Sequence, residues 1–185
     1  MVSKIILPEK LSSPAVIIER RAHNHDQDIF NLIDGSREFL RRYLFWVDSV
    51  RDLESVRKTT DRFAVNWDNQ DSFEYVYLDP DSGRLVGAGG VHTIDYDNSC
   101  AEFGYYLDKD STGHGYASGF VKLVEEALFA AGIHRLEIRC EKDNAASAKV
   151  AERCGYQFEG CCRDKLFAYG TYRDELIFAK INPKD

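Results

Sequence analysis

Residues 108–119 read "DKDSTGHGYASG", and they join a run of β-forming residues to a helical pattern. Gly113 and Gly115 stand one residue apart just before that helix begins. The first N–H groups of a helix have no intrahelical partners, and glycine lets a ligand approach them closely. Phosphate groups bind at helix N-termini of this kind. The stretch therefore predicts a phosphate-binding loop at the start of a helix.

The patterns on the two sides of this loop predict different sheet connections. Before it, the β-forming runs 72–78, 84–94 and 100–107 are separated by short turns, which is typical of an antiparallel meander. After it, apolar residues at helical spacing cover 116–131, and a strand pattern at 134–140 follows. The strands before and after this helix are therefore expected to be parallel and joined by a right-handed crossover.

The remaining segments complete an α+β fold. Further strands or helices are expected at 15–20, 26–41, 53–67, 145–154, 156–161 and 175–181. Because a chain of 185 residues can bury one full core, we expect a mixed sheet in a single domain over residues 1–185. The core of that domain is expected at about 16–181.

Composition and charge exclude several classes of protein. Charged residues make up 30% of the chain and hydrophobic residues 44%, which is ordinary for a soluble globular protein. The formal net charge of −7 argues against binding to nucleic acid or to anionic membranes, and it fits an amine substrate. Because no apolar stretch of about 18 residues is present, we expect no membrane span. The five cysteines form no C-x-x-C pair, which indicates a reduced, cytoplasmic protein without a structural metal.

Three classes of phosphate ligand compete for the glycine loop. A nucleotide P-loop requires Lys followed by Ser or Thr after the last glycine, and this stretch has neither. A dinucleotide fingerprint is closer, with Glu141 at about the right distance for a ribose contact, but Ser118 replaces its third glycine. The loop also follows a meander, whereas a Rossmann unit opens a parallel sheet. The third class is a pyrophosphate held by loop amides without magnesium, as in coenzyme A.

The sequence resembles the GCN5-related N-acetyltransferases (GNATs), in the branch that acetylates N-termini of ribosomal proteins. Three stretches carry the resemblance: "AEFGYYLDKDSTGHGYASG" (101–119), "HRLEIRCEKDNAASAKVAERCGYQFEG" (134–160) and "GTYRDE" (170–175). "FLRRYLFWVD" (39–48) and "VGAGGVHTID" (86–95) agree more loosely. The resemblance implies a sheet whose fourth and fifth strands splay apart, with acetyl-coenzyme A lying in the opening.

The resemblance also implies which residues contact the cofactor. The pyrophosphate cradle would consist of Gly113, His114, Gly115, Tyr116, Ala117 and Ser118. Backbone groups near Tyr106, Leu107 and Asp108 would hold the pantetheine arm, and Asn144 would hydrogen-bond the same arm. The family commonly has Gln or Arg where this chain has Asp110, and a protonated His114 would partly compensate for that carboxylate.

Acetyl transfer requires a proton donor for the departing thiolate, and Ser147 is the candidate that the resemblance places near the sulfur. The alternative role of Ser147 is that of a helix-start serine that bonds local backbone groups. Relatives outside this branch use a later tyrosine, but we interpret Tyr156 as a core residue. The oxyanion would take a backbone N–H from the splayed fourth strand.

The general base is left open by the sequence. Glu102 on the fourth strand is the first candidate, and His92, Asp164 and water are the alternatives. Leu166 stands where some members of the branch carry a carboxylate. The aromatic segment 43–48 and the helix after it would cover the substrate side.

The sequence thus indicates an acetyl-coenzyme A-dependent N-acetyltransferase that acts on a protein or peptide N-terminus. One alternative is a small-amine acetyltransferase, for example of a polyamine or an antibiotic. Another is a non-catalytic acyl-coenzyme A-binding module, which Asp110 and Leu166 suggest. Either a monomer or a homodimer is compatible with these patterns.

Overall fold

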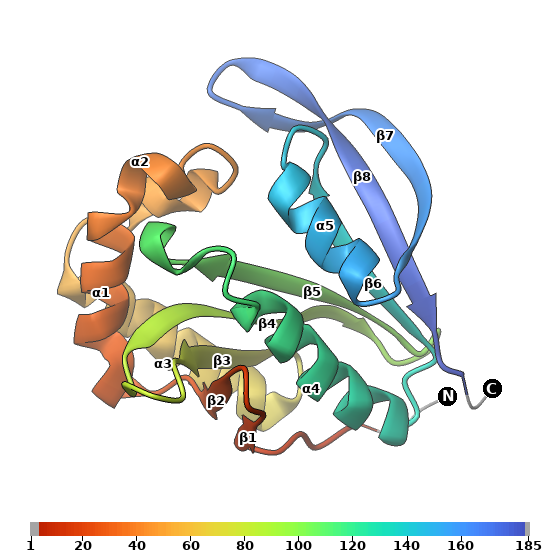
Figure 1. The fold of residues 1–185 in the computed structure, drawn as a ribbon, viewed down its shortest axis with the longest axis horizontal. Coiled ribbons are helices and arrows are strands. Elements are labelled where there is room, and N and C mark those ends of the chain that lie inside the picture. Colours follow the sequence, from red (N-terminus) through yellow and green to blue (C-terminus); the bar gives the residue numbers. More distant parts are fainter. Residues whose placement is uncertain (1–3, 184–185) are drawn as a thin grey trace.

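The computed structural model describes residues 4–183, and one mixed sheet of eight strands runs through them in the order β1-β2-β3-β4-β5-β6-β8-β7 (Figure 1). The strands are β1 (Lys10–Ser12), β2 (Ile17–Arg20), β3 (Phe73–Leu78), β4 (Leu85–Asp95), β5 (Cys100–Leu107), β6 (Arg135–Glu141), β7 (Gln157–Ala168) and β8 (Thr171–Ile181). β3, β4 and β5 form the antiparallel meander, and β5 pairs with β6 in parallel. The predicted fold class is confirmed.

Helices cover both faces of this sheet. They are α1 (Asp26–Gly35), α2 (Arg37–Leu40), α3 (Leu53–Asn69), α4 (Tyr116–Ala130) and α5 (Ala145–Arg153), with 3-10 turns η1 (His23–His25), η2 (Phe45–Ser49) and η3 (Lys109–Ser111). Figure 1 shows α4 in front of the sheet and α3 behind it. None of the helices within residues 4–183 is long and apolar enough to cross a bilayer.

The core on the α4 side is built from aromatic side chains. Phe120 of α4 is fully buried and lies 4.6 Å from the ring of Tyr77 and 5.6 Å from that of Phe103. Successive side chains of a strand point to opposite faces, so the neighbouring Val76 packs instead with Ile29 and Ile33 of α1. Because a large buried aromatic typically contributes about 3–5 kcal/mol, Phe120 fixes α4, and with it the glycine loop, against the sheet.

The parallel pair β5–β6 separates after a few residues. Its pairing ends at Phe103 opposite Ile138, although β5 continues to Leu107. The Asp108 N–H donates to the Val86 carbonyl of β4 at 2.9 Å. Alternate residues of a strand direct their backbone groups to the same neighbouring strand, so Tyr106 and Gly104 also face β4. The backbone groups of Tyr105 and Leu107 therefore face the opening. The expected splay of the fourth and fifth predicted strands is present between β5 and β6.

The C-terminal hairpin differs from the sequence-based expectation. β7 and β8 span 12 and 11 residues, and they extend well past the strands predicted at 156–161 and 175–181. Charged residues interrupt the apolar alternation here, and the register shifts between Cys162 and Leu166. Tyr169 and Gly170, both with positive φ, make a two-residue turn that suits a hairpin. The short β1 strand was not predicted either.

Candidate active site

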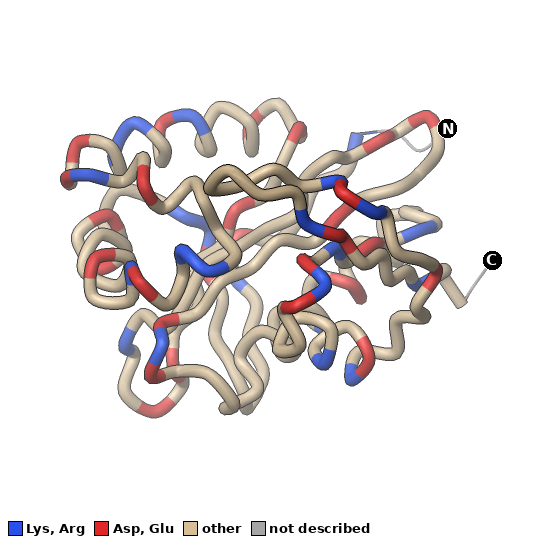
Figure 2. Tube along the Cα trace, turned by 90° about the horizontal axis from the view of Figure 1, so that it is seen from above, with Lys and Arg blue, Asp and Glu red and all other residues tan. Residues whose placement is uncertain are grey.

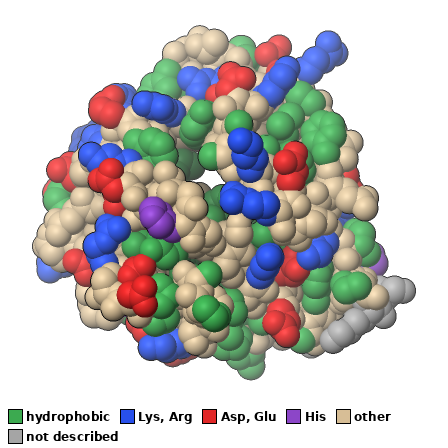
Figure 3. Space-filling view, viewed as in Figure 1, with side chains coloured by type: hydrophobic (Ala, Val, Ile, Leu, Met, Phe, Trp, Pro, Cys, Tyr) green, Lys and Arg blue, Asp and Glu red, His purple; other side chains and the backbone are tan. Residues whose placement is uncertain are grey.

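Two cavities meet at the C-terminal end of β5. The first, which we term the loop cavity, has a volume of about 340 Å³ and lies between the glycine loop, α5 and the segment 39–44. The second, the α3 cavity, has a volume of about 450 Å³ and lies between α3 and the sheet. Leu44, Tyr105 and Tyr106 line both of them. Figure 3 shows a hollow between the part of the molecule that carries α1 and α2 and the part that carries α5, with Lys and Arg side chains beside it.

The glycine loop leaves the start of α4 open. Gly113 and Gly115 have φ angles of +85° and +87°, which favour glycine, and Gly115 is the N-cap of α4. A Cβ atom built at either glycine would meet no other atom within 4 Å. The protein therefore leaves open space beside both glycines at the start of α4, where an anion can approach the first helical N–H groups.

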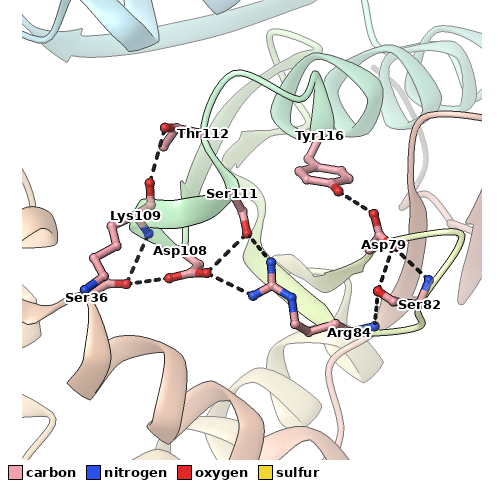
Figure 4. A network of polar contacts seen from close by, with 9 residues as sticks. All are labelled: Ser36, Asp79, Ser82, Arg84, Asp108, Lys109, Ser111, Thr112 and Tyr116. Atoms are coloured by element: carbon pink, nitrogen blue, oxygen red, sulfur yellow. Dashed lines mark hydrogen bonds and ion pairs between the residues drawn. The ribbon is translucent and has the colours of Figure 1, made fainter.

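Polar contacts hold this loop from both of its ends (Figure 4). The Asp108 carboxylate accepts hydrogen bonds from Ser36 Oγ at 2.8 Å, Arg84 Nη1 at 3.0 Å and Ser111 Oγ at 3.2 Å. Burial raises the pKa of Asp108, but these hydrogen bonds outweigh it and lower the pKa. At the other end, the Tyr116 hydroxyl donates to the Asp79 carboxylate and lowers its pKa.

The structure brings half of the predicted cofactor residues to one cavity. Five of the ten line the loop cavity together with the candidate proton donor Ser147: Tyr106, Leu107, Gly113, Ala117 and Asn144. His114, Gly115, Tyr116 and Ser118 lie further along the loop and the first turn of α4. Asp108 is already engaged, because its N–H bonds Val86 and its carbonyl accepts the Ser111 N–H at 3.0 Å.

Ser147 lies at the point where the loop cavity reaches β5. Its N–H is capped by the Asn144 side chain at 3.2 Å, which starts α5. Its hydroxyl lies 3.0 Å from the hydroxyl of Tyr105. Burial raises the pKa of Tyr105, although the Ser147 hydrogen bond lowers it, so the phenol stays protonated near neutral pH. Tyr105 was not predicted from the sequence. The available signal was its position two residues after Phe103, which places both side chains on the same face of the strand.

Tyr156, the alternative proton donor, occupies a different environment. It is 4% exposed and packs in the α4-side core, and it lines neither cavity. Burial, followed by the charge of Glu125, raises its pKa far above the usual range. The interpretation of Tyr156 as a core residue agrees with this position.

The three candidate bases occupy different places. Glu102 is opposite His92 on β4 and Glu137 on β6, and burial raises its pKa while Arg139, 3.6 Å away, lowers it. Asp164 lies on the β7–β8 hairpin, where its N–H bonds Asp174 at 3.1 Å. Neither Glu102 nor Asp164 lines the α3 cavity or the loop cavity.

His92 does line the α3 cavity, and it is paired with a buried carboxylate. Its Nε2 lies 2.9 Å from Oε1 of Glu74, a residue that the sequence reading overlooked. Burial lowers the pKa of His92, but its hydrogen bond to Glu74 and the charges of Glu74 and Glu102 outweigh it and raise the pKa. The imidazole sits over Gly104, where a Cβ atom would come within 3.3 Å of the ring. The lone Glu in the apolar strand "FEYVYL" (73–78) was the available signal for Glu74.

The rest of the α3 cavity is aromatic and basic. Trp46 of the segment 43–48 contacts Tyr106 edge-on at 5.2 Å, and Phe63, Arg21 and Arg62 complete the side toward α3. Within residues 4–183, no group of three His, Cys, Asp or Glu side chains is arranged to hold a metal ion.

Comparison with known proteins places this architecture in a family. The family model for the acetyltransferase (GNAT) domain matches residues 17–157. The chain therefore belongs to the GNAT acetyltransferase family, and it is an N-acetyltransferase.

Three individual proteins illustrate the similarity. The chain is 29% identical over 182 residues to the ribosomal-protein-serine acetyltransferase of Escherichia coli K12, with 98% of each chain covered. Among solved structures, a ribosomal L7/L12 α-N-protein acetyltransferase bound to coenzyme A as a cysteine disulfide is similar, with a TM-score of 0.90, 24% identity and 96% and 100% of the two chains covered. The microcin C7 self-immunity acetyltransferase MccE, in complex with acetyl-CoA and AMP, gives a TM-score of 0.86 at 20% identity, with 90% and 92% covered.

Proposed function

We propose that this protein transfers the acetyl group of acetyl-coenzyme A to the N-terminal amine of a ribosomal protein. The observation that carries the proposal is the junction of two cavities at Tyr105 and Tyr106, with the Ser147 hydroxyl on one side and His92 on the other. A donor in one cavity and an amine in the other would meet at the splayed end of β5. The ribosomal class of the acceptor rests on the E. coli relative, which is 29% identical over almost the full chain.

The loop cavity fits coenzyme A as donor. Its open helix start offers N–H groups to a pyrophosphate, which needs no magnesium at such a position. The free backbone groups of Tyr105 and Leu107 suit the amides of a pantetheine arm, because they form an unpaired strand edge inside the sheet. The six lining residues named above, with the loop residues His114, Gly115, Tyr116 and Ser118, make up the proposed cofactor site.

The residues at the junction supply the steps of acyl transfer. The amine nitrogen attacks the thioester carbon, the C–S bond breaks, and the proton of the amine leaves to a base. The N–H of Tyr105 faces the opening and is the proposed donor to the oxyanion. Ser147 is the proposed proton donor to the thiolate, and the protonated Tyr105 hydroxyl at 3.0 Å replaces that proton.

His92 accepts the amine proton in this proposal, and Glu102 assists it through its charge. His92 lines the acceptor side, whereas Glu102 stands opposite it on the next strand and adds negative charge that raises the pKa of His92. A base works best when its pKa lies close to the working pH, because a useful fraction is then unprotonated and still basic enough to take the proton. Glu74 orients the imidazole through the 2.9 Å contact with its Nε2.

We also propose that the chain acts as one cytoplasmic domain. A single sheet connects residues 10 to 181, and each cavity draws on segments from both halves of the chain. All five cysteines are free, in keeping with a reducing compartment.

The test is release of free coenzyme A together with intact mass of the acceptor. The panel contains N-terminal peptides of ribosomal proteins, the same peptides with a blocked N-terminus and an internal lysine, and small amines such as spermidine. We expect a mass increase of one acetyl group on free N-termini alone. Acetylation restricted to small amines, or to internal lysine, would overturn the proposal.

A further inference from the structure

Arg21 follows β2 and is buried at 6% exposure beside the α3 cavity, a rare environment for an arginine. Its Nε donates to Thr60 Oγ1 at 3.0 Å and its Nη2 donates to the Val56 carbonyl at 3.3 Å. Both acceptors are neutral, and a guanidinium group carries five donors. Arg21 makes no direct ion pair among residues 4–183, and its hydrogen bonds reach a carboxylate through Thr60, whose Oγ1 donates to Asp26 Oδ1 at 2.6 Å.

Arg62 on α3 stands on the same side of the cavity and is also outside every ion pair of the described chain. Both guanidinium carbons lie 5.2 Å from the centroid of the Phe63 ring. Arg84, Arg139 and Arg173 are partly or largely exposed and each contact a carboxylate. Figure 2 shows basic and acidic residues interspersed along the trace of this net acidic chain. Arg21 differs from the other arginines of residues 4–183 because it is buried and makes no direct ion pair.

The sheet fixes how far this basic end lies from the site of transfer. Arg21 is opposite Glu74, Glu74 is opposite Gly90, and Gly90 is opposite Gly104. Three strand spacings of about 4.8 Å place the Arg21 backbone about 14 Å from Gly104, where β5 begins to splay. An extended peptide advances about 3.3 Å per residue, so an amine near Gly104 puts the second to fourth residue of its chain near the arginines.

We propose that Arg21 and Arg62 form a receptor for a carboxylate of the acceptor, and that the preferred acceptor is a peptide N-terminus with Asp or Glu at positions two to four. This inference rests on the proposed function and adds the sequence class of its acceptor. A bidentate contact from a guanidinium group to a carboxylate neutralises the buried charge of Arg21 and uses its remaining donors. Glu74 lines the same cavity, but its Oε1 contacts His92 at 2.9 Å and it makes no ion pair with Arg21.

The test compares matched peptides that differ only in charge. One peptide carries Asp and Glu at positions two to four, and its partner carries Asn and Gln at the same positions. A hydrogen-bonded charge pair predicts that the wild-type enzyme favours the acidic peptide by about 10- to 100-fold in kcat/KM, mainly through KM. A free acidic amino acid serves as a third arm, and its acetylation at the rate of the acidic peptide would overturn the peptide class.

Two variants locate the preference in the cavity. Arg62→Met should reduce kcat/KM for the acidic peptide several-fold more than for the neutral peptide. Arg21→Met should abolish the preference, and Arg21→Lys keeps the charge in case the Met variant does not fold. Arg57→Met is the matched control, because Arg57 is exposed on α3 and lines neither cavity.

The possible outcomes distinguish failure of the carboxylate receptor from failure of the proposed N-terminal acetylation. Equal rates for the two peptides, or a preference that survives in both arginine variants, would overturn the receptor while leaving N-terminal acetylation in place. Failure to acetylate any peptide would remove both.

Discussion

The loop cavity and the α3 cavity share one wall but are built from different parts of the chain. The loop cavity offers mainly backbone groups, held by two positive-φ glycines and by the unpaired side of β5. The α3 cavity offers side chains instead, among them Arg21 and the Glu74–His92 pair. Backbone N–H groups suit an acetyl donor that is always the same molecule. Side chains can be exchanged one at a time, so they suit an amine substrate that differs between enzymes.

The supports of the two cavities follow the same division. Asp108 ties the base of the loop to Ser36 at the end of α1 and to Arg84 before β4, so the backbone of the loop cavity is held by charged hydrogen bonds. The α3 cavity relies on packing of α3 and on the aromatic pair Trp46–Tyr106. Substitutions in the loop should therefore affect donor affinity, and substitutions behind α3 should affect the acceptor.

The largest expected effect tests the backbone character of the loop cavity. Gly115→Glu should weaken coenzyme A binding by about 100-fold or more, because its charge repels the pyrophosphate and its side chain enters the open space before α4. Calorimetry measures the affinity. Gly115→Ala is the matched control and isolates the left-handed strain, which is worth about 1–2 kcal/mol. If the Glu variant binds as tightly as the wild type, the pyrophosphate lies elsewhere.

The next effect concerns the shared wall. Ser147→Ala should lower kcat by about 100-fold and change the dissociation constant of acetyl-coenzyme A only a few-fold, since the hydroxyl acts mainly in the transition state. Tyr105→Phe removes the partner hydroxyl at 3.0 Å but leaves Ser147 in place, so its loss should be smaller. Steady-state kinetics and calorimetry separate the two quantities. A Ser147→Ala enzyme that keeps most of its kcat would return Ser147 to a role in starting α5.

The smallest effect is a shift in the pH profile on the acceptor side. Glu74 raises the pKa of His92, so Glu74→Gln should lower that pKa and move the acidic limb of kcat/KM to lower pH. A raised His pKa stabilises the fold fully below the unfolded-state pKa, and this stabilisation is lost as pH rises through the folded-state pKa. The wild type should therefore exceed the Gln variant in stability more at pH 5 than at pH 8.

His92 is followed by NMR titration, and stability by urea unfolding. Glu102→Gln is the comparison variant, and its shift should have the same direction but a smaller size, because Glu102 contributes charge without a hydrogen bond. A pKa of His92 that stays the same in Glu74→Gln would contradict the pairing.

The same division explains how much of the site the sequence could predict. The loop cavity depends on close spacings along the chain, such as Gly113 to Gly115 and Asn144 to Ser147, and these patterns were recognisable. The α3 cavity combines Arg21, Arg62, Glu74 and His92 from separate segments, and each of them alone has an ordinary structural role. Tyr105 was equally hard to predict, because the residue that it contacts, Ser147, lies 42 positions away in the sequence. The fold was predictable from periodicity except at β1 and in the hairpin, where charged residues obscure the alternation of β7.

The separation of β5 from β6 leaves an unpaired strand edge, and such an edge affects how readily a protein aggregates. Tyr105 and Leu107 present unsatisfied strand groups, which on an outer strand would invite a neighbouring molecule to add its own strand and start aggregation. Here that edge is recessed between α5 and the segment 39–44, and the Tyr43 hydroxyl bridges the two sides by bonding the Asp143 carbonyl at 3.1 Å. A recessed strand edge of this kind is less accessible to a strand of another molecule than an edge at the rim of the sheet, which removes one route to aggregation.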